Sequence, residues 1–231
     1  MASCVEPWNN PFFGVGLTVV LYVLMSHIQQ RVRWLHPLLF SSALIIVFLS
    51  LTGIPHDAYQ AGGELVSFWL GPATVALAVP FVRQFQTFRR HMFGILCGVT
   101  AGSIVGIVSA GAIAWVLGGQ SEVVLSMLPK SVTSPISAEL SRELGGIPGL
   151  TVVVTVLAGL LGNVWGYSLM QRLGITDPVA RGTAMGTAAH GIGTARALQV
   201  SPMDGGMSSF AMGLAGLITS ILVIPLYGWM F

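Results

Sequence analysis

Apolar stretches of membrane-spanning length follow one another along almost the whole chain, with only short polar turns between them. Such a stretch needs about 20 residues to cross a bilayer as a helix. Only 8% of the 231 residues are charged, whereas soluble domains carry about 25%. We therefore predict an all-α integral membrane protein in which residues 1–231 form a single polytopic membrane domain.

Eight segments can be drawn along the chain, separated by turns that contain glycine, proline or basic residues. They lie at about 12–30, 36–54, 63–83, 92–118, 121–144, 147–172, 178–199 and 206–230. No positively charged region precedes the first apolar run, so we interpret it as a span and not as a cleaved signal peptide.

The basic residues indicate how these segments are oriented. The clusters at 31–33 and 83–90 share one side of the membrane if the second and third segments both cross, and the positive-inside rule makes that side cytoplasmic. Arg172 and Arg181 return to it only if one intervening element enters and leaves on the same face. The segment 121–144 is the candidate, because it contains prolines where a span should be regular. We predict about seven transmembrane helices plus this broken or re-entrant element, which would fit an inverted-repeat transporter fold. A Pro-kinked ordinary span is the alternative.

The turn of this element contains Lys130, the only lysine of the sequence, between two apolar runs. A charge near the bilayer core is costly and usually functional. The free N–H groups of a helix N-terminus would form a cradle for an anion there, together with Lys130 and neighbouring hydroxyls. Those hydroxyls belong to Ser131, Thr133 and Ser134. The alternative is that Lys130 extends to the membrane interface while the hydroxyls bond the backbone.

The segment 181–198 is rich in glycine, alanine and threonine in an otherwise strongly apolar chain. At helical spacing, one of its faces carries Thr183, Thr187, His190 and Thr194. This stripe is suited to line a polar site, and His190 is a candidate for proton coupling or, alternatively, a hydrogen-bonded packing residue. Gly182 and Gly186 form a G-x-x-x-G pair that lets another backbone approach. Arg196 either reaches a carboxylate or anchors the helix at the interface.

Two absences are informative: the middle of the apolar segments lacks acidic residues, and the sequence lacks common enzyme motifs. All eight carboxylates lie near predicted ends or turns, so the polar interior is cationic and rich in hydroxyls, which favours an anionic substrate. The sequence contains no G-x-S-x-G, H-E-x-x-H, P-loop or C-x-x-C motif. We therefore expect no enzyme, no catalytic residue, no metal site and no cofactor. The net charge of +2 gives no reason to expect a nucleic acid partner.

Several of these motifs resemble the LrgB/CidB family, and most of all its YohK-type bacterial branch. The segments are LTGI at 51–54, LGPATVALA at 70–78, LPKSVTSPI at 128–136, GGIP at 145–148 and GTAMGTAAHGIGTARAL at 182–198. The resemblance implies a multi-pass protein of the bacterial inner (plasma) membrane. Through a distant kinship with antiporters and bile-acid symporters, it also implies inverted repeats with broken helices.

The resemblance implies two different functions. Members are described as holin/antiholin-like modulators of murein hydrolase activity and autolysis, which act with a small LrgA/CidA-type membrane protein. Related systems take up pyruvate or exchange glycolate and glycerate. The chain lacks the buried carboxylates of cation/proton antiporters, so we do not expect cation exchange.

Our main hypothesis is a membrane transporter or facilitator of small monocarboxylates of the pyruvate, glycolate and glycerate class. The substrate carboxylate would bind beside Lys130, Ser131, Thr133 and Ser134. The opposite wall would be formed by Thr183, Thr187, His190, Thr194 and Arg196. The alternative is a regulator of murein hydrolases that forms homo-oligomers, or binds an LrgA/CidA-type partner, through the face of Gly182 and Gly186. A channel-like pore is a third hypothesis.

Overall fold

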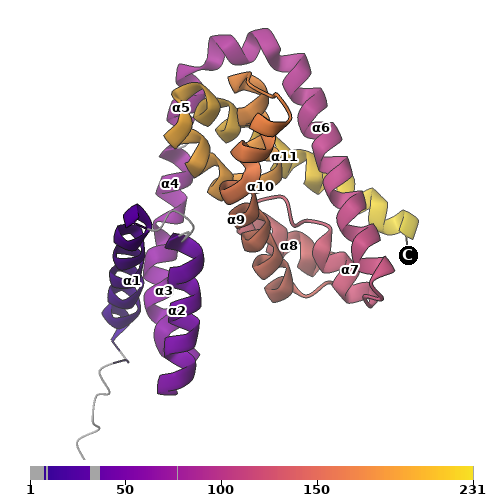
Figure 1. Ribbon diagram of the computed structural model, residues 1–231. Helices are drawn as coiled ribbons and strands as arrows, with labels where there is room; N and C mark the ends of the chain where they lie inside the picture. The colour runs from indigo at the N-terminus through magenta and orange to yellow at the C-terminus, as the bar shows by residue number, and fades with distance from the viewer. Residues whose placement is uncertain (1–7, 9, 32–36, 77, 231) are drawn as a thin grey trace, which may run out of the picture. The chain divides into compact units, whose positions relative to one another are not determined.

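The computed structural model of the chain describes residues 8, 10–31, 37–76 and 78–230. Within these ranges the protein is helical and contains no strand. Its helices are α1 (Pro11–Arg31), α2 (Pro37–Thr52), α3 (His56–Phe68), α4 (Leu70–Ala76), α5 (Ala78–Arg83), α6 (Phe85–Val116), α7 (Ser121–Met127), α8 (Ser134–Glu143), α9 (Pro148–Arg172), α10 (Pro178–Val200) and α11 (Pro202–Met230) (Figure 1). The expected all-α class is confirmed.

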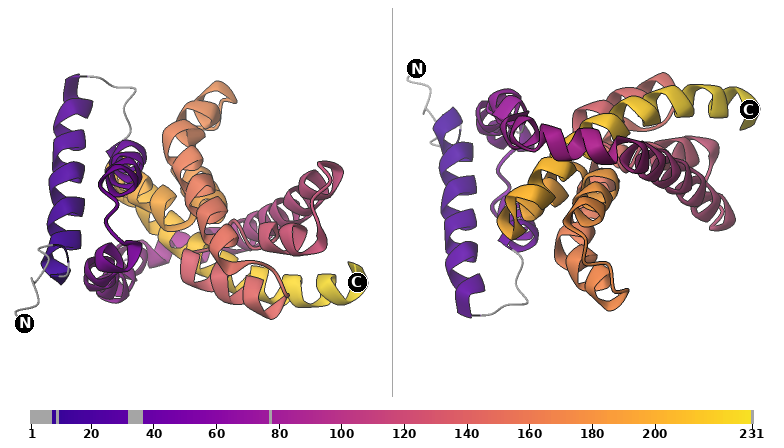
Figure 2. Two further views of the ribbon diagram at one scale, coloured as in Figure 1. Left: turned by 90° about the horizontal axis from the view of Figure 1, so that it is seen from below. Right: turned by 90° about the horizontal axis from the view of Figure 1, so that it is seen from above.

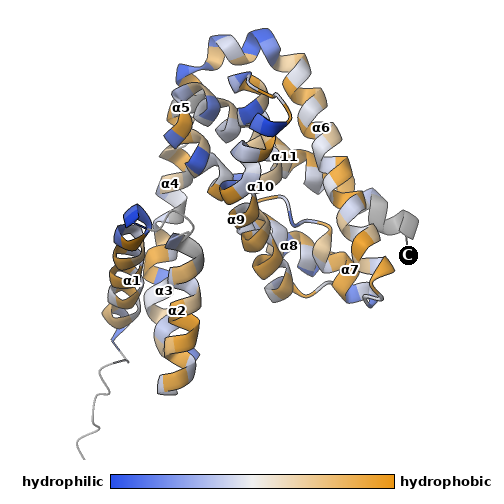
Figure 3. Ribbon diagram, viewed as in Figure 1, coloured by the Kyte–Doolittle hydropathy of each residue, from blue (hydrophilic) through white to orange (hydrophobic). Residues whose placement is uncertain are grey.

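Four helices in the described part are long and apolar enough to cross a membrane, namely α1, α6, α9 and the Pro202–Val223 part of α11. A shorter apolar helix covers Phe40–Thr52 within α2. Figure 3 shows hydrophilic residues gathered at the start of α6, whereas α9 is mostly hydrophobic. This distribution is typical of helices whose middle lies in hydrocarbon and whose ends reach water.

Prolines and local caps set where several helices begin. Proline is the first residue of α1, α2, α9, α10 and α11; its fixed φ suits the first turn, where its missing N–H is not needed. The Asp177 side chain accepts from Ala180 N (2.9 Å) and thereby caps α10. In the same way, Ser201 Oγ accepts from Asp204 N (3.0 Å) at the start of α11.

The predicted segment at 63–83 is not one continuous helix, because α3 ends within it and a new helix follows. Helix α3 ends at Phe68, α4 begins at Leu70, and α5 begins at Ala78. Pro72 explains the break between α3 and α4, since proline is tolerated in the first turn of a new helix but clashes inside a continuing one. Residue 77, between α4 and α5, lies outside the described residues.

The chain divides into two compact units, Met1–Ala76 and Leu77–Phe231. In the first unit, α1 packs on both α2 and α3. The contact with α3 is close because Gly14 meets Gly62, where a Cβ on Gly62 would lie 2.6 Å from Gly14 Cα. Thr18 Oγ1 and Tyr59 Oη, at 2.9 Å, form a hydrogen bond across the same pair of helices.

In the second unit, α6 and α11 form the main apolar contact. The cluster that joins them contains Phe88, Ile95, Val99, Met207, Ala211 and Ala215, all of them buried. Further along α6, Ile107 packs with Leu125 and Leu128 from the α7 region and with Val223 of α11. The long α6 thus forms one edge of the unit and leads directly into α7 (Figure 1).

The predicted break within 121–144 is confirmed, and the element is a hairpin. Helix α7 ends at Met127, the turn contains Lys130, and α8 begins after the turn at Ser134. The last turn of α7 and the last turn of α8 meet at Thr151 of α9, whose Oγ1 lies 2.9 Å from Ser126 O and 2.7 Å from Ser141 Oγ. We call α7, the turn and α8 the first hairpin.

Helix α10 is not the continuous helix that the sequence predicts. At His190 the backbone leaves the helical region, with φ 39° and ψ −134°. Beyond this point the chain folds back, because Met185 and Ala197 belong to one buried cluster, whereas a continuous helix would separate them by about 18 Å. We call α10 the second hairpin, with arms at 178–189 and 191–200 and its tip at His190.

Both arms of the second hairpin pack on the start of α11. Gly186 of the first arm lies directly against Ser208 O. Thr194 of the second arm lies with its Oγ1 2.9 Å from Ser208 Oγ. Positions four residues before and four residues after His190 therefore meet the same residue, as the two arms of a hairpin do.

The G-x-x-x-G face of α10 is covered by α11 of the same chain. A Cβ on Gly182 would collide with Asp204 O, and one on Gly186 would collide with Ser208 O. Both glycines are buried. The expectation that this face binds another chain is therefore wrong, because the α11 backbone already occupies it.

Helix α9 lies between the two hairpins, which approach it from opposite ends. The first hairpin contacts Thr151 near the start of α9, and the second has its base near Met170 towards the end. Between these points, His190 Nε2 donates to Thr155 O (2.9 Å) and Thr155 Oγ1 donates to Ser137 Oγ (3.1 Å). The tip of the second hairpin and the first turn of α8 thus meet at Thr155 of α9.

Candidate functional site

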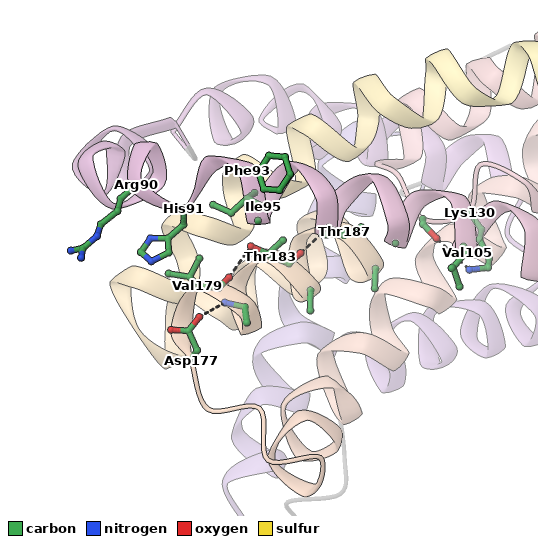
Figure 4. A pocket seen from close by; sticks show the side chains of 18 residues that line it. Arg90, His91, Phe93, Ile95, Val105, Lys130, Asp177, Val179, Thr183 and Thr187 are labelled. Atoms are coloured by element: carbon green, nitrogen blue, oxygen red, sulfur yellow. Dashed lines mark hydrogen bonds between the residues drawn. The ribbon is translucent and has the colours of Figure 1, made fainter.

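A cavity of about 850 Å³ lies between α6, the first arm of α10 and the turn of the first hairpin. Figure 4 shows Arg90, His91 and Asp177 at one end and Lys130 at the other, with Thr183 and Thr187 between them. The predicted pairing of the Lys130 segment with the 181–198 segment therefore exists as a shared cavity. It includes only part of the residues that the sequence suggested.

Lys130 forms the inner end of the cavity together with Ser131. Its Nζ donates to Ser131 Oγ (3.3 Å) and, among the described residues, forms no ion pair with a carboxylate. The side chain is half-buried. An ammonium group that has lost part of its water and has no counter-ion attracts an anion strongly, because the local dielectric is low.

Thr183 and Thr187 form the α10 wall, and both are buried. Their hydroxyls donate to backbone carbonyls one turn earlier, Thr183 to Val179 O (2.7 Å) and Thr187 to Thr183 O (2.8 Å). Because the single proton of each hydroxyl is used in this way, the oxygens remain available as acceptors. This wall is therefore suited to receive a hydrogen bond from a ligand hydroxyl.

The opposite wall is a ladder of four glycines on α6, which the sequence reasoning missed. Gly94, Gly98, Gly102 and Gly106 all line the cavity. Their spacing of four residues places them on one face of the helix. That spacing was the available signal, but the same pattern also serves ordinary helix packing.

The end of the cavity opposite Lys130 carries charges of both signs. Arg90 and His91 belong to the start of α6, and Asp177 precedes α10. Asp177 is already engaged as the cap of α10, and His91 Nδ1 is hydrogen-bonded to Thr87 O (3.0 Å). Arg90 is exposed and, in the described part of the chain, forms no ion pair.

Four of the predicted site residues do not line the cavity. Thr133 precedes α8 as its cap residue and Ser134 begins the helix, and both are half-buried. Thr194 is fully buried against Ser208. Arg196 is exposed and donates to Gln199 Oε1 (3.2 Å).

His190 is the fifth predicted residue that the structure separates from the cavity. The break at this residue turns its ring away from Thr183 and Thr187 and towards α9, where Nε2 donates to Thr155 O. Gly159 provides the space, since a Cβ there would lie 2.7 Å from His190 Nε2. The single stripe predicted for a continuous helix is therefore wrong, because the stripe ends where the helix breaks.

A buried hydroxyl network joins the first hairpin to α9. Its members, all fully buried, are Ser126, Ser137, Ser141, Thr151 and Thr155. Besides the bonds already described, Ser126 Oγ accepts from Ile147 N (2.7 Å) and donates to Glu122 O (2.6 Å). These hydroxyls fix the hairpin against α9 without placing a charge in the interior.

The second hairpin is fixed at its base by a buried carboxylate, Asp204. The positions of the acidic residues in the sequence did not predict this burial. Asp204 has 0% exposure. Its oxygens accept from Arg181 Nε and Nη2 (both 3.1 Å), from Tyr167 Oη (3.1 Å) and from Ser201 Oγ (2.5 Å). The network links α9, both ends of α10 and α11. Sequence reasoning correctly placed Asp204 near a helix end but assigned it to a turn.

With this geometry in place, the class of the protein is that of a helical membrane protein with two helical hairpins and a cavity that has cationic side chains at both ends. The model of the LrgB-like family matches residues 18–229, nearly the whole chain. The chain therefore belongs to the LrgB-like family. No solved structure matches it.

Proposed function

We propose that the protein binds small carboxylate anions in the α6–α10 cavity and transports them across the bacterial inner membrane. The observation that carries this proposal is Lys130, which lies on the turn of a hairpin at the inner end of the cavity. A lysine is costly to bury without a counter-ion. A bound carboxylate would supply that charge, and the threonine wall would accept a hydrogen bond from a substrate hydroxyl.

The two hairpins support a transporter over a purely structural membrane protein. In many secondary transporters, interrupted helices meet near the midplane and form the substrate site. Here each hairpin arm is too short to cross a bilayer, since 12 helical residues extend about 18 Å and the hydrocarbon core is about 30 Å thick. Re-entrant elements of this kind are acceptable only where protein or a water-filled cavity surrounds them.

We further propose that residues 121–172 and 178–230 are inverted repeats, each a hairpin followed by a crossing helix. Both crossing helices contain the sequence LAGL, at 157–160 and at 214–217. The glycine of each LAGL receives the hairpin of the other repeat: Gly159 receives His190, and a Cβ on Gly216 would lie 3.1 Å from Ile136 Cδ1. In both views of Figure 2, the yellow end of α11 passes beside the pink α8.

The charges then orient these repeats in the membrane. The cavity end with Arg90 shares its side with Arg172 and Arg181, whereas Glu122 and Glu143 lie at the two ends of the first hairpin. The positive-inside rule makes the arginine side cytoplasmic. With α10 as a hairpin, three crossings remain after residue 84. Adding the three predicted for the N-terminal part gives six crossings and two re-entrant hairpins, instead of seven and one.

Replacement of Lys130 tests the proposed function. Lys130→Met keeps the length of the side chain but removes its charge, and we expect carboxylate uptake into proteoliposomes to fall about tenfold or more, because hydrogen bonds to charged groups contribute about 1.5–3 kcal/mol. Arg142→Gln is the matched control, since Arg142 is an exposed cation outside the cavity, paired with Glu139. Normal uptake by Lys130→Met would contradict the assigned site.

Control of murein hydrolases with an LrgA/CidA-type partner is the alternative function. The G-x-x-x-G face that would have supported it is covered by α11. Wild-type protein that takes up no small carboxylate in the same assay, with or without a pH gradient, would overturn the transport proposal and favour this alternative.

A further inference from the structure

The two walls of the cavity come closer together from the Arg90 end towards Lys130. A Cβ added to Gly94 would meet nothing within 4 Å. At Gly98 it would lie 3.8 Å from Thr183 Cγ2, and at Gly102 it would lie 2.9 Å from Thr187 Cγ2. One turn further, a Cβ on Gly106 would lie 3.2 Å from Ser131 Oγ. The α6 wall therefore touches α10 at Gly102, next to the Lys130 end.

We propose that Gly102 and Thr187 form a constriction that selects the substrate by its width; this inference rests on the proposed function. An acid that moves from the Arg90 end to Lys130 passes along the glycine ladder, where α6 presents backbone only. At Gly102 the Thr187 methyl group fills the space that a side chain would occupy. The Thr187 hydroxyl donates to Thr183 O (2.8 Å), and this bond fixes the orientation of the side chain. The width of the cavity at this level therefore depends on the position of one methyl group, Thr187 Cγ2.

The contact also separates the two functions of Thr187. Its Oγ1 is the acceptor on the cavity wall, whereas its Cγ2 limits the space. Thr187→Ser removes Cγ2 and keeps the hydroxyl, so it widens the passage without removing the polar group. Gly102→Ala has the opposite effect, because the new methyl group must displace Thr187 Cγ2. The double variant exchanges one methyl group for the other across the same contact.

The test uses glycolate, lactate and 2-hydroxyisobutyrate, which share a carboxylate and a hydroxyl and differ by successive methyl groups. We expect Thr187→Ser to raise the uptake of 2-hydroxyisobutyrate relative to glycolate by about tenfold, the lower end of what one methylene can discriminate in a pocket. Gly102→Ala should lower the same ratio, and Gly102→Ala with Thr187→Ser should return it to the wild-type value. Gly213→Ala is the control, because it adds the same methyl group on α11, outside the cavity and without a contact.

The outcomes distinguish this inference from the proposed function. Uptake of glycolate by the wild type, with a ratio that Thr187→Ser leaves unchanged, overturns the constriction alone. Wild type that takes up none of the three acids overturns the proposed function. Thr187→Ser creates no clash, so it decides the matter even if Gly102→Ala does not fold.

Discussion

His190 is a non-glycine residue held at a positive φ of 39° in the interior of the protein. Such a conformation costs on the order of 1–3 kcal/mol and persists only where the surroundings fix it. Here the ring is 4% exposed, and it is fixed by Thr155 O and by the space over Gly159. The side chain thus stabilises a backbone shape that the sequence around it would not adopt alone.

Substitution of His190 tests this account at the scale of one residue. Both His190→Gly and His190→Ala lose the ring, but only glycine adopts the observed φ without strain, so we expect the glycine variant to be more stable by about 1 kcal/mol. Thermal unfolding in detergent measures the difference. In an uninterrupted helix the order is reversed, with alanine more stable by about 1 kcal/mol. Greater stability of His190→Ala would therefore argue against the break.

At the scale of elements, the two hairpins are held in place by different chemistry. The first uses neutral hydroxyls such as Ser126 and Ser141, which meet at Thr151. The second uses the ion pair of Arg181 with the fully buried Asp204. Removing one partner of a buried ion pair leaves an uncompensated charge, which lowers stability strongly. Removing one neutral hydroxyl leaves no such charge.

Asp204→Asn tests how strongly the second hairpin depends on this ion pair. We expect a loss of about 3–5 kcal/mol in unfolding free energy, because Arg181 would lose its counter-charge, and the loss should appear as a large fall in the thermal unfolding midpoint. Glu139→Gln is the control, since the Glu139–Arg142 pair is more than half exposed on both sides, at 61% and 62%, and such pairs contribute about 0–1 kcal/mol. Equal effects of the two variants would show that the buried pair has no special role.

At the scale of the whole molecule, the second hairpin changes the number of membrane crossings. If 178–200 crossed the membrane once, its two ends would lie on opposite sides. As a hairpin, it returns both ends to one side. In the proposed topology, the crossings of the second unit are α6, α9 and α11, each of which contains a stretch long and apolar enough to cross a membrane.

Accessibility of single cysteines decides between these topologies. In a variant without Cys4 and Cys97, we expect Thr176→Cys and Gln199→Cys to react with a membrane-impermeant maleimide only from the cytoplasmic side, and Glu143→Cys only from the outside. All three positions are exposed. Reaction of Thr176→Cys and Gln199→Cys from opposite sides would contradict the hairpin topology.

The sequence predicted those parts of the fold and site that depend on neighbouring residues. The break in 121–144 follows from prolines in the turn and at the start of α8, and the functional importance of Lys130 follows from its apolar surroundings. The pairing of Lys130 with Thr183 and Thr187 was also predicted, because polar residues in an apolar chain often line a common site. The glycine ladder of α6 did not emerge, since its spacing is equally typical of helix packing.

By itself, the sequence determined a helical membrane protein with one broken element, because hydrophobicity and proline act on the nearest few residues. Only the tertiary structure decided that α10 folds back at His190, that α11 covers Gly182 and Gly186, and that Asp204 is buried. These features depend on contacts between residues that are many positions apart along the chain, such as His190 with Thr155 and Gly186 with Ser208. The strain at His190 is tolerated only because those distant residues hold its ring in place.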